Sequence, residues 1–319
     1  MSVRFGLAVE NFTPATKNPD FEAIRNFVVT AEQLGYSSFW TWDHLFLGSR
    51  RPFPFLEALT TLSAIASFTK AAELGTGVLV LPLREPVALA KTAATIQAQS
   101  GGRLTLGMAA GWYKREFDAV GIPFEERGRV FERNLDIVRA LWDEDDVTGE
   151  IGGRRFTHVS MLPRPHPAPK VLIGGYVDRV LRRVATRSDG WITYFYTAQS
   201  FERSWAKVQH FAEQAGRDPG ALENVAQLPL CIGPSFEEAT ERGFRYVADY
   251  FDVAEWSEST RESTVRGTPE QCAEQIQAHI DAGVKHVVLC PCDYAVEQVE
   301  RFAEEVLPLL GVTSPVLPG

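Results

Sequence analysis

The chain has 319 residues, of which 45% are hydrophobic, and carries a formal net charge of −9. Its length exceeds that of a usual single domain, but an α/β barrel commonly reaches it as one unit. The negative charge argues against nucleic acid or an anionic membrane as the main partner. No apolar run approaches the ~20 residues that a membrane-spanning helix needs. We therefore expect one globular domain over residues 1–319.

The four cysteines lie in the last third of the chain, at Cys231, Cys272, Cys290 and Cys292. The Cys-Pro-Cys spacing is too tight for a usual zinc pair, and no second pair completes four ligands. No secretory signal precedes the first predicted strand. We therefore expect reduced, structural thiols in a cytoplasmic protein without a bound metal.

Strand-like and helix-like segments alternate along the chain. The first half predicts strands at 4–9, 38–42, 74–81 and 104–109, and helices at 19–34, 56–69, 86–99 and 124–143. The second half predicts strands at 170–173, 189–194, 225–232 and 286–290, and helices at 177–185, 200–215, 236–250, 268–282 and 295–310. Eight strands, each followed by a helix, predict a (β/α)8 TIM barrel with insertions after strands four and seven. A doubly wound open sheet is disfavoured because the first turn lacks a Gly-rich dinucleotide fingerprint.

Three segments depart from this alternation, at 45–55, 148–169 and 252–265. Barrel enzymes diversify their chemistry through loops. We therefore expect all three segments to cap the mouth of the barrel and to set the choice of substrate. Phe46, Phe53 and Phe55 in the first segment indicate an apolar substrate, or the aromatic part of one.

Barrel active sites form at the C-terminal ends of the strands. These ends contain few carboxylates or histidines, and only Asp43 and His44 form an acid/base pair. A two-metal hydrolase or a glycosidase with paired acids is therefore disfavoured. Glycine, tryptophan and tyrosine at the other strand ends favour a planar organic cofactor. The turn of Gly174 and Gly175 before a helix can bind an anion through backbone N–H groups and the helix dipole.

Five segments in order resemble the bacterial luciferase-like superfamily of flavin and deazaflavin oxidoreductases. They read FWTWDHL, LGTGVLVLPLREPVALAKTAATI, SGGRLTLGMAAGW, ERG and VLIGG…DGW. The similarity is densest from Phe39 to Trp142, returns at Val171 to Trp191 and is faint afterwards. It implies a barrel that holds the isoalloxazine, or its deaza analogue, at the strand ends. It also implies a bulge in strand three, often with a non-prolyl cis peptide, which would fall at Gly77-Val78.

The resemblance further implies roles for individual residues. His44 would face the reactive edge of the ring and act in catalysis with Asp43, which would also contact the cofactor. Other cofactor contacts are expected at Thr76, Gly77, Val78, Gly111, Trp112, Gly174, Gly175 and Tyr176, the last three at the phosphate. Some deazaflavin-using members have a Glu at the position of Trp112, so this chain lacks that potential acid. Ordinary structural explanations stay open: a cap or structural hydrogen bond for Asp43, core packing for Trp112 and solvated surface positions for Arg179 and Arg182.

We expect an oxidoreductase that uses coenzyme F420 for hydride transfer with a small, partly apolar organic substrate, because the Asp-His pair favours that cofactor. The alternative is a two-component monooxygenase that takes reduced FMN from a separate reductase and inserts oxygen through a C4a-peroxyflavin. A non-catalytic flavin-binding barrel would be expected to lack Asp43 and His44, and a Schiff-base aldolase would depend on Lys114. The resemblance also favours a homodimer. The apolar stripe at Leu59, Leu62 and Ile65 could form its interface, although packing on the barrel explains the stripe equally.

Overall fold

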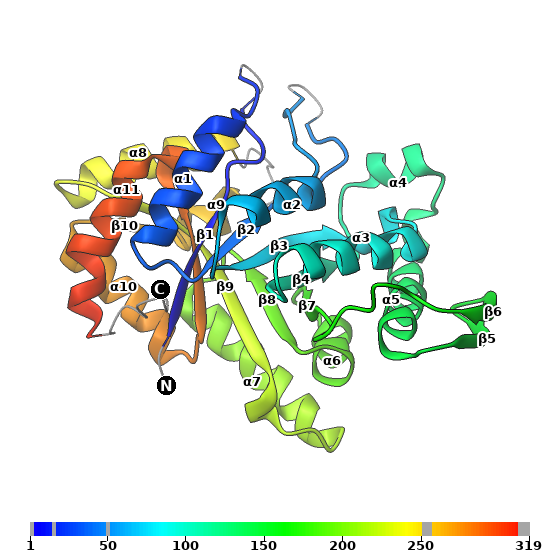
Figure 1. The fold of residues 1–319 in the computed structure, drawn as a ribbon. Helices are drawn as coiled ribbons and strands as arrows, with labels where there is room; N and C mark the ends of the chain where they lie inside the picture. The colour runs from blue at the N-terminus through cyan, green and yellow to red at the C-terminus, as the bar shows by residue number, and fades with distance from the viewer. Residues whose placement is uncertain (1–2, 15–16, 49–51, 251–256, 312–319) are drawn as a thin grey trace.

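The computed structural model describes residues 3–14, 17–48, 52–250 and 257–311. Eight parallel strands close into a barrel, and helices surround it (Figure 1). In order around the barrel the strands are β1 (Arg4–Ala8), β2 (Ser38–Thr41), β3 (Glu73–Val80), β4 (Leu104–Ala109), β7 (Lys170–Gly174), β8 (Gly190–Tyr194), β9 (Glu223–Ile232) and β11 (His286–Pro291). β11 pairs with β1 and closes the ring. The predicted TIM barrel is confirmed.

The predicted helices are all present, and most of their ends differ by at most three residues. They are α1 (Phe21–Gln33), α2 (Ala58–Phe68), α3 (Pro86–Gln99), α5 (Arg127–Asp143), α6 (Asp178–Arg187), α7 (Ala198–Gln214), α8 (Phe236–Tyr250), α10 (Pro269–Asp281) and α11 (Val296–Arg301). The last predicted helix, at 295–310, is divided into α11, a π-helical segment (Phe302–Val306) and a 3-10 helix (Leu307–Leu310). Elements that were not predicted include the hairpin at residues 147–159, α4 (Lys114–Val120), α9 (Ser257–Glu262) and the short strand β10 (Val265–Gly267), which pairs with the end of β9.

Local sequence signals explain where several helices begin and end. α3 begins with Pro86, and the side chain of Glu85 accepts a hydrogen bond from the N–H of Ala88. Proline suits the first helical turn because its missing N–H would have no intrahelical partner there. α10 begins with a capping box formed by Thr268 and Gln271, which satisfies two backbone donors at once.

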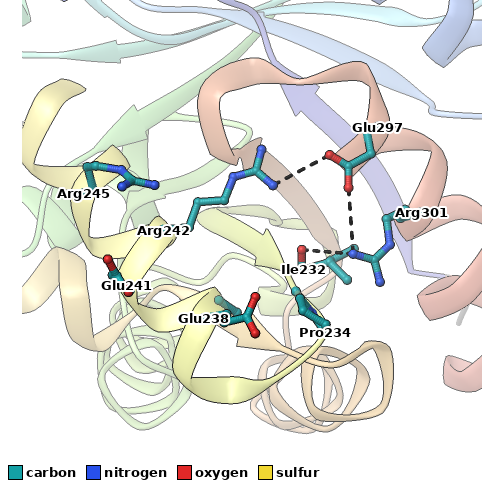
Figure 2. A pocket seen from close by; sticks show the side chains of 10 residues that line it. Ile232, Pro234, Glu238, Glu241, Arg242, Arg245, Glu297 and Arg301 are labelled. Carbon is teal, nitrogen blue, oxygen red and sulfur yellow. Dashed lines mark hydrogen bonds and ion pairs between the residues drawn. The ribbon is translucent and has the colours of Figure 1, made fainter.

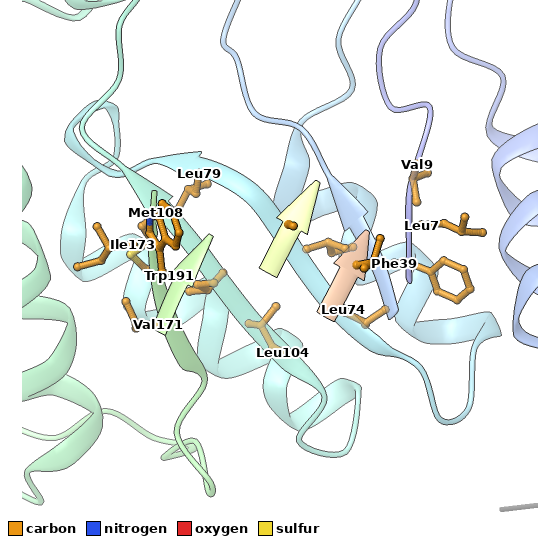
Figure 3. Close-up of a cluster of buried hydrophobic side chains, with 14 of the residues drawn as sticks. Leu7, Val9, Phe39, Leu74, Leu79, Leu104, Met108, Val171, Ile173 and Trp191 are labelled. Carbon is orange, nitrogen blue, oxygen red and sulfur yellow. The ribbon is translucent and has the colours of Figure 1, made fainter. Parts of the chain in front are cut away.

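Two buried clusters reflect the alternation of side chains along the strands. Phe39 belongs to the large cluster between the strands and the helices (Figure 3), whereas the adjacent Trp40 belongs to the cluster inside the barrel. Ile173 and Leu172 are divided in the same way. Successive residues of a strand point to opposite faces, so strands such as β2 and β7 contribute to both clusters. The apolar runs of the sequence are therefore needed on both faces.

The expectation that residues 148–169 cap the mouth is wrong. The region contains an antiparallel hairpin of β5 (Val147–Ile151) and β6 (Arg154–Val159), which lies beside α5 on the outside of the barrel (Figure 1). Further along, the carbonyl of Pro167 accepts a hydrogen bond from Gln97 at the end of α3. An insertion between a helix and the next strand leaves from the N-terminal end of the barrel, opposite the mouth.

The other two insertions are described in part. In the 45–55 segment, residues 49–51 lie outside the described residues, and the flanking parts fold over the end of β1, where Phe12 and Phe55 form a β-bridge. In the 252–265 segment, residues 252–256 lie outside the described residues, and α9 contacts α8.

Three further observations concern calls made from sequence. Leu59, Leu62 and Ile65 are buried within the chain itself, so packing on the barrel explains this stripe. All four cysteines are buried free thiols. Within the described residues, no helix combines the length and apolar character needed to cross a membrane.

Candidate active site

The backbone of β3 is irregular where a cofactor contact is predicted. The pairing of β3 with β4 shifts between Thr76 and Leu79, and the Gly77-Val78 peptide bond is cis. Both predicted backbone features are confirmed. Gly77 has no space for a side chain, because a Cβ there would lie 2.6 Å from Oε1 of Gln227 inside the barrel.

The bulge of β3 lies against the predicted phosphate-binding turn. A Cβ on Gly174 would lie 3.2 Å from Cγ1 of Val78, so the side chain of Val78 packs against the backbone of the turn. The indole of Trp191 donates to the carbonyl of Gly175 over 2.9 Å and fixes the turn. α6 begins directly afterwards, and no side chain caps its first N–H groups. Tyr176, at the same turn, is 71% exposed.

Asp43 follows β2, and both oxygens of its carboxylate bond to other residues of the chain. One carboxylate oxygen accepts from the N–H of Val80 over 2.9 Å, and the other pairs with Arg84. Arg84 also pairs with Glu57 over 3.0 Å. Burial raises the pKa of Asp43, and the charge of Arg84 opposes this shift. Asp43 therefore ties the end of β2 to the end of β3, which is the structural alternative considered for it. A direct cofactor contact stays a prediction.

His44 is held by a carboxylate that was not predicted from the sequence. Its Nδ1 lies 2.9 Å from Oε2 of Glu116, whose side chain is 1% exposed. The other oxygen of Glu116 accepts from the N–H of Leu45 over 2.6 Å and from that of Phe46 over 3.4 Å. Among the described residues, Nε2 of His44 has no hydrogen-bond partner, and it is not an enclosed atom. One ring nitrogen is thus held and the other is accessible.

Aromatic side chains surround the imidazole of His44. The rings of Phe55 and Trp112 lie 5.5 and 5.7 Å from it, both close to edge-on, and Tyr113 lies at 6.4 Å. Phe12, which is buried, stacks on Phe55 with ring centroids 4.7 Å apart. The structure therefore places His44 and Trp112 together in an apolar setting, as expected for a site that takes a partly apolar substrate.

Several candidates are turned away from this rim. Thr76 is fully buried, and its hydroxyl donates to the carbonyl of Gly107 on β4. The guanidinium of Arg182 lies 3.9 Å from the ring centroid of Phe211 on α7. Lys114 is exposed and pairs with Asp118 on the same helix. A Schiff-base lysine needs desolvation to lower its pKa, so the aldolase alternative loses its candidate.

Gly111 joins β4 to the segment that carries Trp112. Its φ is +84°, a region that favours glycine, and a Cβ there would lie 2.6 Å from Cγ1 of Val80. The backbone passes so close to the end of β3 that only glycine fits this turn. Gly111 therefore controls where the chain leaves β4 towards α4.

A separate hollow of about 310 Å³ lies between α8 and α11 (Figure 2). It contains none of the predicted site residues. Its arginines are largely neutralised by nearby acids: Glu297 lies 3.7 Å from Arg242 and 3.9 Å from Arg301, which also donates to the carbonyl of Ile232. We therefore place the candidate active site at the ends of β2, β3 and β4.

Glu10 and Tyr250 form a second acid/hydroxyl pair that sequence reasoning did not single out. Glu10 follows β1, and the hydroxyl of Tyr250 on α8 donates to its carboxylate. Burial raises the pKa of Glu10, although the bond from Tyr250 opposes the shift. The position of Glu10 at a strand end was a usable signal. Its partner lies 240 positions away in the sequence and could not be found from spacing.

The fold is a TIM barrel, and His44 lies with Glu116 at its C-terminal rim. The family model for luciferase-like monooxygenases matches residues 3–264, and the chain belongs to this family. The resemblance noted from the sequence is thereby confirmed.

Relatives with assigned activities use two different cofactors. The chain is 27% identical to the F420-dependent glucose-6-phosphate dehydrogenase of Kribbella flavida, over 97% of this chain and 99% of the relative. It is 28% identical to the FMNH2-dependent dimethylsulfone monooxygenase of Pseudomonas fluorescens, over 71% of this chain and 70% of the relative. The expectation of a luciferase-like enzyme is confirmed, and both cofactors considered from the sequence occur among its relatives.

Solved structures agree on the fold. An F420-dependent secondary alcohol dehydrogenase superposes with a TM-score of 0.81 at 18% identity, over 97% of this chain and 99% of that one. The oxygenating constituent of 3,6-diketocamphane monooxygenase from Pseudomonas putida superposes with a TM-score of 0.78, also at 18% identity, over 97% of this chain and 99% of that one.

Proposed function

We propose that this chain is an oxidoreductase that uses coenzyme F420 to transfer a hydride to or from a small, partly apolar organic substrate of the alcohol or carbonyl type. The observation that carries the proposal is His44, an imidazole with one nitrogen held by Glu116 and the other accessible at the rim. Conversion of an alcohol to a carbonyl releases a proton as well as a hydride, so it needs an acid/base group at the reacting oxygen.

The rim has features that suit a flat cofactor with a phosphate. Gly77 and Gly174 carry no side chains of their own, and the bulge brings the side chain of Val78 beside the diglycine turn. We propose that the ring lies along the bulge and near Trp112, and that the phosphate binds at Gly174, Gly175 and Tyr176, where α6 begins without a side-chain cap. Backbone N–H groups at a helix start attract anions.

When bound, F420 accepts or supplies a hydride at C5 of its ring. A residue of the chain has to accept or donate the accompanying proton. In the oxidative direction the substrate carbon loses a hydride, its hydroxyl loses a proton to Nε2 of His44, and the carbon–oxygen double bond forms. In the reductive direction protonated His44 returns that proton to the new hydroxyl. Phe55 and Trp112 exclude water from the imidazole, which strengthens these polar interactions.

Titration of the purified protein with F420 and, separately, with FMN under anaerobic conditions tests the proposal. We expect saturable binding of F420 and, with a panel of secondary alcohols, loss of the oxidised F420 absorbance at a rate that oxygen does not change. Tight binding of FMN together with product formation that requires oxygen would overturn it.

The alternative proposal is a two-component monooxygenase that takes reduced FMN from a separate reductase. The observation that favours it is Trp112 beside His44, at the position where some deazaflavin-using members have a Glu. The same titrations separate the two functions, because only the monooxygenase consumes oxygen in proportion to product.

We further propose, on the family resemblance alone, that the protein is a cytoplasmic homodimer. Light scattering of the purified protein tests the dimer, and a mass equal to one chain would contradict it.

A further inference from the structure

Glu116 is buried, and its position is fixed by the helix that carries it and by hydrogen bonds from other segments. It lies in the first turn of α4, it is 1% exposed, and one of its oxygens accepts from the N–H groups of Leu45 and Phe46. Its second oxygen lies 2.9 Å from Nδ1 of His44. The carboxylate therefore connects α4 to the end of β2 and to the start of the loop that follows.

The hydrogen bonds of Glu116 determine which nitrogen of the His44 ring is a donor and which is an acceptor. An ionised carboxylate accepts hydrogen bonds and donates none, and the oxygen facing Leu45 and Phe46 already accepts from them. The other oxygen then accepts from His44, so the proton of the neutral ring lies on Nδ1. Nε2 is left with its lone pair, ready to receive a proton.

The neighbouring rings hold the imidazole in one orientation. Phe55, Trp112 and Tyr113 all lie nearly edge-on to it, at interplanar angles of 70°, 82° and 88°. In the orientation that they surround, Nδ1 faces Glu116. A carboxylate behind an imidazole fixes the tautomer and stabilises the ring after it has taken up a proton.

We infer that Glu116 is the positioning residue of this active site: it holds His44 in the Nδ1–H tautomer, so that Nε2 faces the reacting oxygen as the proton acceptor. The role of Nε2 rests on the function proposed above, whereas the tautomer is a property of the free protein. Glu116 also makes this tautomer depend on the loop at Leu45 and Phe46, because one carboxylate binds both.

Glu116→Gln gives the sharpest test. In the variant the amide oxygen still has to accept from Leu45 and Phe46, so the amide NH2 faces Nδ1 of His44. Because an NH2 group only donates, Nδ1 has to accept, and the proton moves to Nε2. We expect the tautomer of His44 to reverse and kcat to fall by on the order of 10²-fold, with a smaller change in KM.

The measurement is ¹⁵N NMR of the histidine rings in cofactor-free protein, at an alkaline pH where imidazole is neutral. His44→Asn identifies the His44 signals by their loss. Glu116→Asp keeps the charge and should retain the wild-type tautomer with partial activity. The matched control is Asp118→Asn, on the exposed side of the same helix, which should change neither tautomer nor kcat.

Several outcomes would overturn the inference. A wild-type His44 with its proton on Nε2 does so without any variant, which covers the case in which Glu116→Gln fails to fold. An unchanged tautomer in folded Glu116→Gln does so as well, and so does a reversed tautomer with unchanged kcat. If the tautomer reverses as expected but the wild type shows no F420 turnover, the tautomer assignment stands and the proposed function fails.

Discussion

The two ends of the barrel use their polar residues differently. At the N-terminal end, Arg103 connects α2, α3 and the start of β4. Its guanidinium donates to the carbonyls of Ala66, Thr69, Ala72 and Ser100 and to the hydroxyl of Thr69. Arg103 therefore has a structural role, with carbonyl and hydroxyl groups as its partners.

At the C-terminal end, some polar groups of the described residues have unused hydrogen-bonding positions that a ligand could take. His44 uses Nδ1 within the protein, and Nε2 stays accessible. The first turn of α6 has no side-chain cap. The comparison indicates that the N-terminal end stabilises the barrel, whereas the C-terminal end holds reactive groups in place with part of their bonding unused. Four experiments test this division.

Replacement of His44 should produce the largest effect. His44→Asn removes the proton acceptor at the rim, and we expect kcat to fall by about 10²- to 10⁴-fold. The free energy of unfolding should also fall, by about 1–3 kcal/mol, because the buried carboxylate of Glu116 loses a donor, so kcat is compared per folded molecule. His158→Asn, an exposed histidine on the hairpin, is the matched control. Equal activity in the two variants would contradict the assignment of the rim.

Arg103→Leu should give the opposite pattern. The change leaves several carbonyls at the N-terminal end without their donor, and each buried unsatisfied group costs about 1–3 kcal/mol. We expect the free energy of unfolding to fall by about 3 kcal/mol in urea titrations, while kcat per folded molecule stays constant. Arg25→Leu removes a surface pair with Glu22 and should cost less than about 1 kcal/mol. A loss of kcat in folded Arg103→Leu would break the division.

A pair of glycines sharpens the comparison further. Gly111 at the rim and Gly102 at the opposite end have φ of +84° and +92°, so alanine costs roughly 1–2 kcal/mol at either site. Only Gly111→Ala also meets Val80 and Phe117, at 2.6 and 2.9 Å, and shifts the segment with Trp112. We expect Gly111→Ala to lower kcat and Gly102→Ala to leave it unchanged. Equal kcat values in the two folded variants would show that this turn does not shape the site.

The smallest effect is a pH dependence of stability that arises at the N-terminal end. His286 begins β11 inside the barrel, and its Nε2 lies 2.8 Å from the hydroxyl of Ser38. Burial lowers the pKa of His286 well below its ordinary value. The unfolded chain therefore binds a proton that the folded chain rejects. The stability that follows is complete above pH ~6.5 and is lost as the pH falls, by up to about 1.4 kcal/mol per pH unit.

Urea unfolding at pH 7.5 and 5.5 measures this slope. His286→Gln removes the titrating ring and should flatten it relative to the wild type. The His158→Asn variant, with an exposed ring, should keep the wild-type slope. Identical slopes for all three proteins would show that His286 does not contribute.

Much of the fold could be predicted because the strands are apolar on both faces and the helices carry clear caps. α3 was predicted with the ends that the structure has, since Glu85 and Pro86 mark its start. The hairpin at 147–159 was missed as an ordered element because its strands are mostly exposed and lack the apolar alternation that identifies a strand. We predicted that this insertion caps the mouth because we treated all three insertions as mouth loops.

The site could be predicted only where a strand end or a glycine marked it. The bulge at Gly77-Val78 and the pair Asp43-His44 lie at such positions. Glu116 was missed because α4 has only seven residues, too few to show a helical period, and its bond to His44 spans 72 positions. The burial of Phe117 beside it and Gly121 at the helix end were the available signals, but neither indicates which side chain reaches His44.

The hairpin of β5 and β6 has a practical consequence. A Cβ placed on Gly153, in its turn, would have no atom within 4 Å, and the hairpin lies beside α5 on the outside of the barrel (Figure 1). A fluorescent label, an affinity tag or a surface linker attached at Gly153 would therefore enter open space outside the barrel, provided that it leaves intact the ion pair of Arg154 with Glu85 at the start of α3. The turn at Gly153 is therefore a suitable attachment site for immobilising the protein.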